Sequence, residues 1–333
     1  MRSKKVGGFF SQGIRWIIFF VLLFYPYNSY SRTILKVFHA GSLSVPFKRI
    51  EKAFEERYPY IDVRTESSGS VMAVRKVIDL HKECDVIAVA DYSLIPSMMF
   101  PRYADHVYLF ARNELVICYR EGSKYSDMIN QENWFNLLNR KSVRWGFSNP
   151  NDDPCGYRSV MCMLLSDIYY KKKISEMLIG KYLPFKLNRH MAIIPEGFSP
   201  KGRKIFIRPK EVDLLALLGA GMIDYCIEYL SVANQHHLRY LPLPPEINLG
   251  HLRFASYYKK VKVRLGNGKL IKGKPIIYGI AILKNSQHPK EARLFEQFVI
   301  GPQGAKILRE SFQTPIYPVK LIRASEWGSR TGR

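Results

Sequence analysis

The first third of the chain alternates between strand-like and helix-like patterns of apolar residues. A β-rich run at 33–39 is followed by a small-residue turn at 40–44. Apolar residues then recur at helical spacing, at Phe47, Ile50 and Phe54. A period of two is typical of a strand and a period of 3.6 of a helix, so this stretch is predicted to form one strand-turn-helix unit.

The same order repeats immediately afterwards. Alternation over 61–65 predicts a second strand, which the small polar turn at 67–70 follows. Apolar residues over 71–78 fit a second helix, and 85–90 is a third apolar strand. Alternating strands and helices predict a parallel sheet with helices on its faces, so the predicted fold class is α/β.

The middle of the chain predicts a second unit of the same kind. Strands are predicted at 142–147, 205–207 and 223–227, and helices at 157–170 and 211–218. Between the two units, Leu109–Tyr119 has β character throughout and is predicted to carry the chain across as one strand. The tail contains a predicted strand at 275–283 and a helical region at 289–311, broken at Gly301-Pro302.

Both small-residue turns of the first unit lie after a strand and before a helix. Such turns meet at the carboxyl edge of a parallel sheet, where open α/β folds bind ligands. Free backbone N–H groups at a helix N-terminus, together with serine hydroxyls, suit an anion. Ser42 and Ser70 are therefore candidate anion ligands, although serine is also a preferred helix cap and the two roles use the same donors.

Composition indicates a basic globular protein. The chain has 333 residues, enough for two ordinary domains, with 47% hydrophobic and 24% charged residues. Its formal net charge of +23 would attract acidic partners. The basic residues are scattered, however, and no RNA-binding aromatic signature, zinc-finger spacing or basic zipper is present, so we expect no nucleic-acid partner.

The N-terminus carries the pattern of an export signal. Basic residues precede an apolar run at 16–25, and small polar residues follow it at 28–31. Residues 1–31 are predicted to be a signal peptide or an N-terminal anchor, and the protein is expected outside the cytoplasm. Five dispersed cysteines, without a C-x-x-C pair, indicate neither a zinc site nor a redox motif.

Several motifs resemble the archaeal tungstate/molybdate-binding proteins, the solute-binding components of ATP-binding-cassette (ABC) importers. D-P-C-G-Y-R-S at 153–159 is the most specific of them, and the motifs together span nearly all of the chain after residue 31 in the right order. The others are A-G-S-L at 40–43, S-S-G-S-V at 67–71, E-V-D-L-L-A-L-L from 211, I-D-Y at 223–225, Y-L-S-V-A at 229–233 and Y-G-I-A-I-L at 278–283.

The resemblance implies a two-lobed periplasmic-binding-protein fold of type II that closes on an oxyanion. Each lobe would be a mainly parallel sheet flanked by helices, with lobe one at 33–115 plus 235–323 and lobe two at 116–234. The protein would hand its ligand to a membrane permease, without catalysis or cofactor, and act as a monomer. The implied ligand-binding residues are Gly41, Ser42, Ser70, Asp153, Pro154, Cys155, Glu211 and Tyr229.

Two carboxylates in an anion site need a physical reason, because like charges repel strongly where water is excluded. Tungsten(VI) and molybdenum(VI) are hard centres that can accept further oxygen ligands, which matches the preference of hard cations for oxygen donors. Asp153 and Glu211 are therefore predicted to bind the metal of tungstate or molybdate directly. From position alone, Asp153 could be a loop or cap residue with Asp152 as the functional acid, and Glu211 could stabilise a helix start.

Three other interpretations remain open from the sequence. The ligand could be sulfate, phosphate or another small anion. A secreted enzyme is disfavoured, because no G-x-S-x-G, H-E-x-x-H or nucleophile–base pair is present. An adhesion protein could use the basic surface. Glu228 departs from the family pattern, where an apolar residue is expected before Tyr229, and Arg158 is expected to support its loop rather than clamp an anion.

Overall fold

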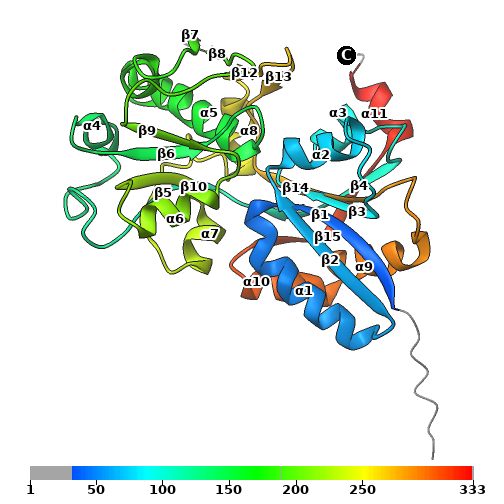
Figure 1. Cartoon of the computed structure of the whole chain (residues 1–333). Coiled ribbons are helices and arrows are strands. Elements are labelled where there is room, and N and C mark those ends of the chain that lie inside the picture. The colour runs from blue at the N-terminus through cyan, green and yellow to red at the C-terminus, as the bar shows by residue number, and fades with distance from the viewer. Residues whose placement is uncertain (1–31, 189, 332–333) are drawn as a thin grey trace, which may run out of the picture. The chain divides into compact units, whose positions relative to one another are not determined.

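The computed structural model describes residues 32–188 and 190–331 (Figure 1). The predicted signal peptide or anchor at 1–31 lies outside these residues. Within them, strands and helices follow one another in the predicted α/β manner and form three sheets. No helix of this described part is both long and apolar enough to cross a membrane.

The first sheet contains six strands. They are β1 (Thr33–Ala40), β2 (Ile61–Ser68), β3 (Val86–Val89), β4 (His106–Arg112), β14 (Ile277–Ile282) and β15 (Thr314–Arg323). Their order is β15-β4-β14-β3-β1-β2. β1 pairs in parallel with β2 and β3, as predicted, whereas β14 and β15 pair antiparallel with their neighbours. The sheet is therefore a parallel unit extended by strands from the end of the chain.

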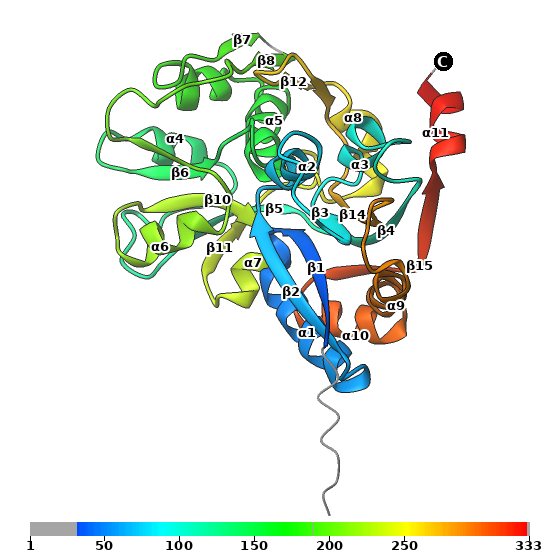
Figure 2. The ribbon, with the colours of Figure 1, turned by 45° about the vertical axis from the view of Figure 1, so that its right-hand side comes forward.

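In the described part of the chain, six helices surround the first sheet and cover its apolar side chains. They are α1 (Ser44–Arg57), α2 (Ser70–Ile78), α3 (Leu94–Met98), α9 (Pro289–Ile300), α10 (Pro302–Glu310) and α11 (Ala324–Thr331). Figure 2 shows α1, α9 and α10 beside β1, β2 and β15. Phe47, Ile50 and Phe54, predicted to form the buried face of α1, are fully buried, and burying such a side chain stabilises by about 1.5–3 kcal/mol.

The second sheet contains five strands in the order β11-β5-β10-β6-β9. They are β5 (Leu115–Tyr119), β6 (Trp145–Ser148), β9 (Ile205–Arg208), β10 (Tyr225–Tyr229) and β11 (Arg239–Pro242), with helices α4 (Trp134–Asn139), α5 (Pro154–Tyr169), α6 (Asp213–Gly219) and α7 (Leu230–Gln235). Figure 1 shows α5 on one side of this sheet and α6 and α7 on the other. The carboxyl end of β6 leads directly into the loop before α5.

A small third sheet was not predicted. Its strands are β7 (Lys186–Asn188), β8 (Met191–Ile193), β12 (Lys262–Arg264) and β13 (Leu270–Lys272), in the order β13-β12-β8-β7, and the short helix α8 (Ala255–Tyr258) precedes β12. Strands of three residues are too short to show a period, which explains why the sequence pattern missed them.

The predicted single strand over Leu109–Tyr119 is wrong in one respect. β4 ends at Arg112 and β5 begins at Leu115, and the two strands belong to different sheets. The break occurs where the chain changes hydrogen-bonding partners, from β14 and β15 to β10 and β11. The predicted crossing between the two units does lie here, because Asn113 and Glu114 connect the first sheet to the second.

Strand pairing also bears on the predicted lobe boundaries. Residues 235–323 were assigned to lobe one, but β11 pairs with β5 of the second sheet and β12 pairs with β8 of the third. The chain rejoins the first sheet only at β14. We therefore propose that the return to lobe one lies at about Lys274 rather than at 235.

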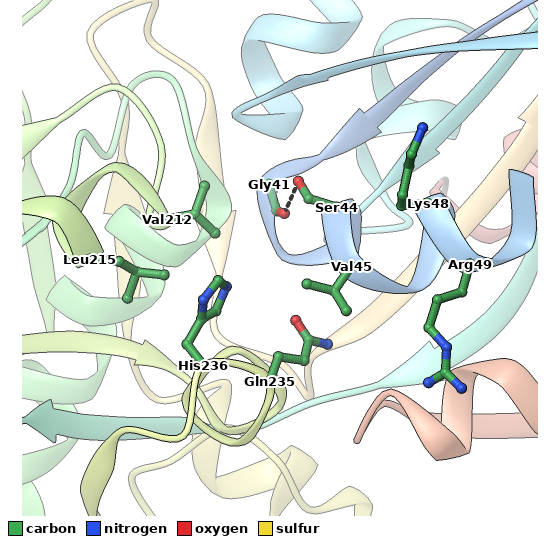
Figure 3. Close-up of a pocket in the computed structure, with 9 residues that line it drawn as sticks. All are labelled: Gly41, Ser44, Val45, Lys48, Arg49, Val212, Leu215, Gln235 and His236. Atoms are coloured by element: carbon green, nitrogen blue, oxygen red, sulfur yellow. Dashed lines mark hydrogen bonds between the residues drawn. The ribbon is translucent and has the colours of Figure 1, made fainter. Parts of the chain in front are cut away.

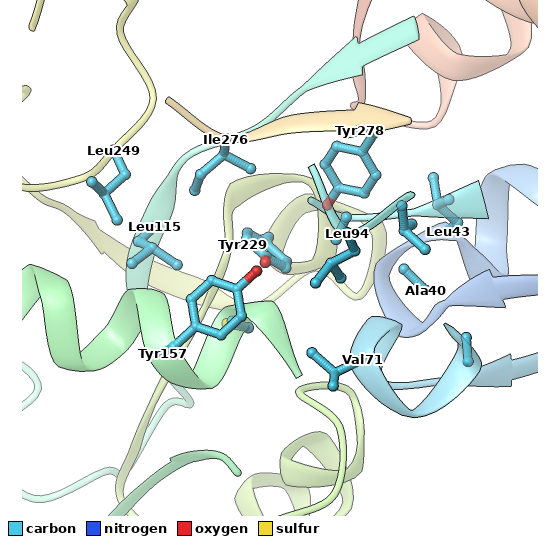
Figure 4. Packing of buried hydrophobic residues seen from close by; sticks show 14 of the residues in the cluster. Ala40, Leu43, Val71, Leu94, Leu115, Tyr157, Tyr229, Leu249, Ile276 and Tyr278 are labelled. Atoms are coloured by element: carbon cyan, nitrogen blue, oxygen red, sulfur yellow. The ribbon is translucent and has the colours of Figure 1, made fainter. Parts of the chain in front are cut away.

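A continuous buried apolar cluster links these elements (Figure 4). Figure 4 shows Leu115, Leu249 and Ile276 near Tyr229 and Tyr278, so residues of both large sheets meet in one region. A smaller cluster, including Leu214 and Leu218 of α6, covers the other face of the second sheet. The candidate site lies where the first two sheets approach each other.

Candidate oxyanion site

The first-sheet side of the site consists of the two turns predicted from the sequence. Ser42 belongs to the short 3-10 turn Gly41–Leu43 after β1, and Ser70 is the first residue of α2. Both side chains are almost fully buried. Ser42 Oγ hydrogen-bonds with Tyr278 Oη at 2.8 Å, and Ser70 Oγ accepts the backbone N–H of Ala90 at 2.9 Å. Neither serine caps its helix by its side chain, so capping alone does not explain them.

Asp153 lies on the opposing side, in the loop between β6 and α5. It occupies the N-cap position of α5, but its side chain makes no capping hydrogen bond. It is 1% exposed, and its Oδ2 atom has no hydrogen-bond partner among the described residues. Asp152, the alternative acid, is half-buried and accepts Asn149 Nδ2 at 2.6 Å. The structure therefore favours Asp153 over Asp152 as the acid facing the site.

Glu211 comes from the segment just before α6. The helix begins at Asp213, so Glu211 precedes it rather than forming its first turn. It is 1% exposed, and neither carboxylate oxygen makes a hydrogen bond of standard geometry among the described residues, although Asp153 and Ser42 lie close enough to affect its ionisation. A buried carboxyl group whose oxygens are not well satisfied is costly to the fold, so structural stability alone does not explain Glu211.

Glycines let the two sides approach closely. A Cβ atom added to Gly41 would lie 2.8 Å from Glu211 Oε2 and 2.9 Å from Glu211 Oε1. A Cβ added to Gly69 would lie 2.5 Å from the carbonyl oxygen of Asp152, which also accepts the N–H of Met72 at 3.2 Å. The turns of the first sheet therefore contact the acid-bearing loops of the second.

The carboxyl groups influence one another's ionisation. Burial, and then the neighbouring charge of Glu211, raise the pKa of Asp153 well above its usual value. Burial also raises the pKa of Glu211, although Asp153 and Ser42 partly offset the rise. The pair therefore favours holding a proton unless a positive centre comes close to it.

Glu228 is a third buried acid near this pair. It is 0% exposed, its Oε2 accepts the N–H of Tyr229 at 3.0 Å, and its Oε1 has no partner among the described residues. Burial, followed by the charge of Glu211, raises the pKa of Glu228 well above its usual value. The sequence drew attention to Glu228 only as a departure from a pattern; its place beside Glu211 could not be seen there.

Tyr229 and the start of α5 complete the set of predicted residues. Tyr229 Oη accepts Arg158 Nη1 at 2.8 Å, and the same Nη1 donates to the carbonyl of Ala90 at 2.9 Å. Arg158 thus reaches the end of β3 instead of only supporting its own loop, as had been expected. Pro154 and Cys155 are buried in the first turn of α5. Pro154 has no backbone N–H, so Cys155 carries the donor here that has no intrahelical partner.

A cavity of about 560 Å³ adjoins the buried site (Figure 3). Gly41 and Val212, the neighbour of Glu211, are among the residues that line it, and Figure 3 shows Lys48 and Arg49 on α1 and His236 from the opposite side. Lys48 pairs with Glu51 and Arg49 with Glu310, so these acids partly offset the attraction of the two cations for an anion. Among the described residues, no group of three or more His, Cys, Asp or Glu side chains is arranged to hold a metal ion.

Comparison with known sequences identifies close relatives. The molybdate/tungstate-binding protein WtpA of Thermococcus kodakarensis is 47% identical over 299 residues, which cover 87% of this chain and 84% of the relative. The protein of the same name from Pyrococcus abyssi is 47% identical over 292 residues, covering 85% of each chain. An uncharacterized solute-binding protein of Staphylothermus marinus is 42% identical over 302 residues, covering 87% and 85%.

Solved structures with the same fold are more distant in sequence. The periplasmic molybdate-binding protein of Azotobacter vinelandii is 16% identical, with a TM-score of 0.59 over 84% of this chain and 98% of that one. The sulfate-binding protein SubI of Mycobacterium tuberculosis is 14% identical, with a TM-score of 0.56 over 86% and 88%. These likenesses confirm the two-lobed periplasmic-binding-protein fold and carry nothing about the ligand.

The family model described as bacterial extracellular solute-binding protein matches residues 35–312. Together with relatives at 47% identity along most of the chain, this match settles the family. The chain belongs to the extracellular solute-binding proteins.

Proposed function

We propose that this protein captures tungstate or molybdate outside the cytoplasm and delivers it to the membrane permease of an ABC importer. It would act as a monomer, without cofactor and without catalysis. The names of its relatives support the ligand class. The single observation that carries the proposal is the buried pair Asp153 and Glu211 opposite Gly41, with three carboxylate oxygens that make no hydrogen bond of standard geometry among the described residues.

The chemistry follows from what such a pair can bind. Sulfate would present only negative oxygens to the two acids, and the repulsion is strong where water is excluded unless a carboxyl group holds a proton. Phosphate keeps a hydroxyl at neutral pH, which could donate to one of the two acids but would leave the other opposed to its negative oxygens. A tungsten or molybdenum centre can accept the carboxylate oxygens as additional ligands, as hard cations prefer. The turns at Gly41, Ser42 and Ser70, with the first turn of α5 at Pro154 and Cys155 and the hydroxyl of Tyr229, would surround the oxide oxygens.

Calorimetric titration of the full chain with tungstate, molybdate, sulfate and phosphate tests this proposal. We expect tight 1:1 binding of the first two and much weaker binding of the others. X-ray absorption of the tungstate complex should report more than four oxygen neighbours around tungsten. Equal affinity for sulfate, or a four-coordinate metal, would contradict the role given to the acids.

The proposed location rests on the family and on the N-terminal pattern. Extracellular solute-binding proteins act outside the cytoplasm, and we propose that residues 1–31 direct export and are then cleaved or kept as an anchor. Mass spectrometry of the protein isolated from membrane and soluble fractions would distinguish these outcomes. A mature chain that begins near Arg32 in the soluble fraction indicates cleavage.

A further inference from the structure

Asp91 is a buried carboxylate two residues after the end of β3, outside the set of proposed ligand residues. It is 0% exposed. Its Oδ1 accepts Lys274 Nζ at 2.8 Å, Ser93 Oγ at 2.8 Å and the N–H of Ser93 at 3.0 Å. Its Oδ2 accepts the hydroxyl of Tyr157 at 2.7 Å and lies 3.7 Å from Arg158 Nη2. Both oxygens are therefore satisfied by polar groups.

Two of the partners of Asp91, Tyr157 and Arg158, come from the other side of the site, and Lys274 lies at the proposed boundary between the lobes. Tyr157 and Arg158 belong to α5, which packs on β6 and β10 of the second sheet. Lys274 lies in the segment that returns the chain from β13 to β14. Arg158 also donates to the carbonyl of Ala90, next to Asp91. The segment after β3 is thus bound to α5 through the side chains of Tyr157 and Arg158. It is bound to the segment between β13 and β14 through Lys274.

The charges in this cluster depend on one another. Burial alone would raise the pKa of Asp91, but Lys274 and Arg158 hold it below its usual value. Burial lowers the pKa of Lys274, and Asp91 opposes that change. Removing one member of a buried charge group leaves the others without compensation, which is far more costly than losing an exposed pair.

The cluster is connected to the proposed ligand residues by short contacts. Arg158 Nη1 donates to Tyr229 Oη, so the phenol oxygen acts as an acceptor and its own hydrogen remains available for another acceptor, such as an oxide oxygen. The helix that carries Tyr157 and Arg158 also begins directly after Asp153. Any movement that separates α5 from β3 would break the Asp91 contacts and displace Asp153 and Tyr229 together.

We propose that Asp91, Tyr157, Arg158 and Lys274 form an interlobe latch that assembles as the two lobes close and that sets how long the oxyanion stays bound. This inference rests on the proposed function. The apparent affinity of a protein that binds in one conformation falls with the population of that conformation. Weakening the latch should therefore weaken binding even though none of these changes touches the ligand, and most of the effect should be on dissociation.

The first test uses Asp91→Asn in the full chain. We expect the dissociation constant for tungstate to rise by at least about 30-fold, as is typical when one partner of a buried charge pair is lost. Stopped-flow measurements should assign most of this rise to the dissociation rate. The matched control is Asp85→Asn, another buried acid, whose carboxylate accepts the N–H of Lys36 at 2.8 Å and Ser286 Oγ at 2.6 Å near the first sheet. It should lower the melting temperature without changing the dissociation rate.

A milder variant keeps the inference testable if Asp91→Asn does not fold. Tyr157→Phe removes only one hydrogen bond and should raise the dissociation constant about 3- to 10-fold. In the double variant, the two effects should be clearly less than additive, since both act through one contact. Tyr225→Phe is the control, because its hydroxyl donates to the carbonyl of Lys124 at 2.5 Å within the second-sheet region.

The outcomes separate the latch from the proposed function. Normal tungstate binding by the unmodified protein, with unchanged dissociation in Asp91→Asn and Tyr157→Phe, would overturn the latch alone. Additive effects of the two substitutions would also overturn it. Failure of the unmodified protein to bind tungstate or molybdate would overturn the proposed function, and the latch with it.

Discussion

The two sides of the candidate site differ in chemistry. The first-sheet side offers Gly41, Ser42 and Ser70, which are neutral and small, whereas the second-sheet side offers the acids Asp153, Glu211 and Glu228. Neutral donors at turns suit any tetrahedral anion. Carboxylates repel such anions unless they are protonated or meet a positive centre. The comparison suggests that one side supplies general affinity for oxyanions and the other selects among them.

Replacing the acid best placed to select should have the largest effect. In Asp153→Asn, we expect tungstate affinity to fall about 100-fold, or ~2.7 kcal/mol, because an amide oxygen is a poorer ligand for a hard metal. Sulfate binding should strengthen in the same variant, because one repulsive charge is gone. Calorimetry with both anions measures the change. Asp152→Asn is the matched control, and equal losses in the two variants would remove the distinction between these neighbouring acids.

Replacing Glu228, the third buried acid, should change the stability of the protein rather than its affinity for tungstate. At pH 7, Glu228→Gln should raise the free energy of unfolding of the ligand-free protein by ~2 kcal/mol, because it removes a buried acid without full partners. The pKa of Glu228 is raised in the folded protein, so the stability of the unmodified protein falls as pH rises from about 4.5, the usual glutamate value, through the raised pKa. The advantage of the variant should therefore vanish near pH 4.5. Urea denaturation at several pH values tests this. If the difference in free energy of unfolding between Glu228→Gln and the unmodified protein does not vary with pH, Glu228 does not have a raised pKa in the folded protein.

Adding a methyl group at Gly41, where the two sides of the site contact each other, should have an intermediate effect on tungstate affinity. Gly41→Ala places a methyl group against the Glu211 carboxylate, which must move, and we expect tungstate affinity to fall about 10-fold, or ~1.4 kcal/mol. Gly219→Ala is the control, because no heavy atom lies within 4 Å of its added Cβ. If both variants bind tungstate like the unmodified protein, Glu211 is not held in place by Gly41.

The smallest effect is expected on the first-sheet side. Ser70→Ala removes the acceptor for the N–H of Ala90 and one proposed donor to the ligand. It should lower the free energy of unfolding by ~1 kcal/mol and tungstate affinity about threefold. Ser166→Ala, which loses a hydrogen bond to the carbonyl of Cys162 within α5, should cost similar stability and no affinity. If Ser70→Ala lost more tungstate affinity than Asp153→Asn, the first-sheet side rather than the acids would select the ligand.

Local patterns were sufficient to predict much of the first sheet. The turns at 40–44 and 67–70 were predicted because small polar residues separate clear strand and helix periods, and α1 and α2 follow them as expected. The helical break at Gly301-Pro302 was likewise confirmed, since proline cannot continue a helix. Such features depend on neighbours in sequence and are visible without the fold.

Features that depend on distant residues were not visible. Asp91 looks like an ordinary turn aspartate in the sequence, because its partners Tyr157 and Lys274 are far along the chain. Glu228 could be recognised only as an acid in an apolar strand; its proximity to Glu211 requires the pairing of the sheet around β10. The short strands of the third sheet depend on pairing between residues near 190 and 263.

The short link between β4 and β5 limits how the lobes can move. Only Asn113 and Glu114 separate the two strands, so four soft backbone torsions connect the first sheet to the second at this point. Asn113 is further held by hydrogen bonds from its Nδ2 to Ser231 Oγ at 2.8 Å and to Tyr278 Oη at 3.0 Å. A connection this short allows one lobe to rotate relative to the other but resists translation between them. The angle through which the two lobes open is therefore limited at this link, which Tyr278 connects to the proposed ligand residue Ser42, and lengthening the link by a few residues would remove that limit.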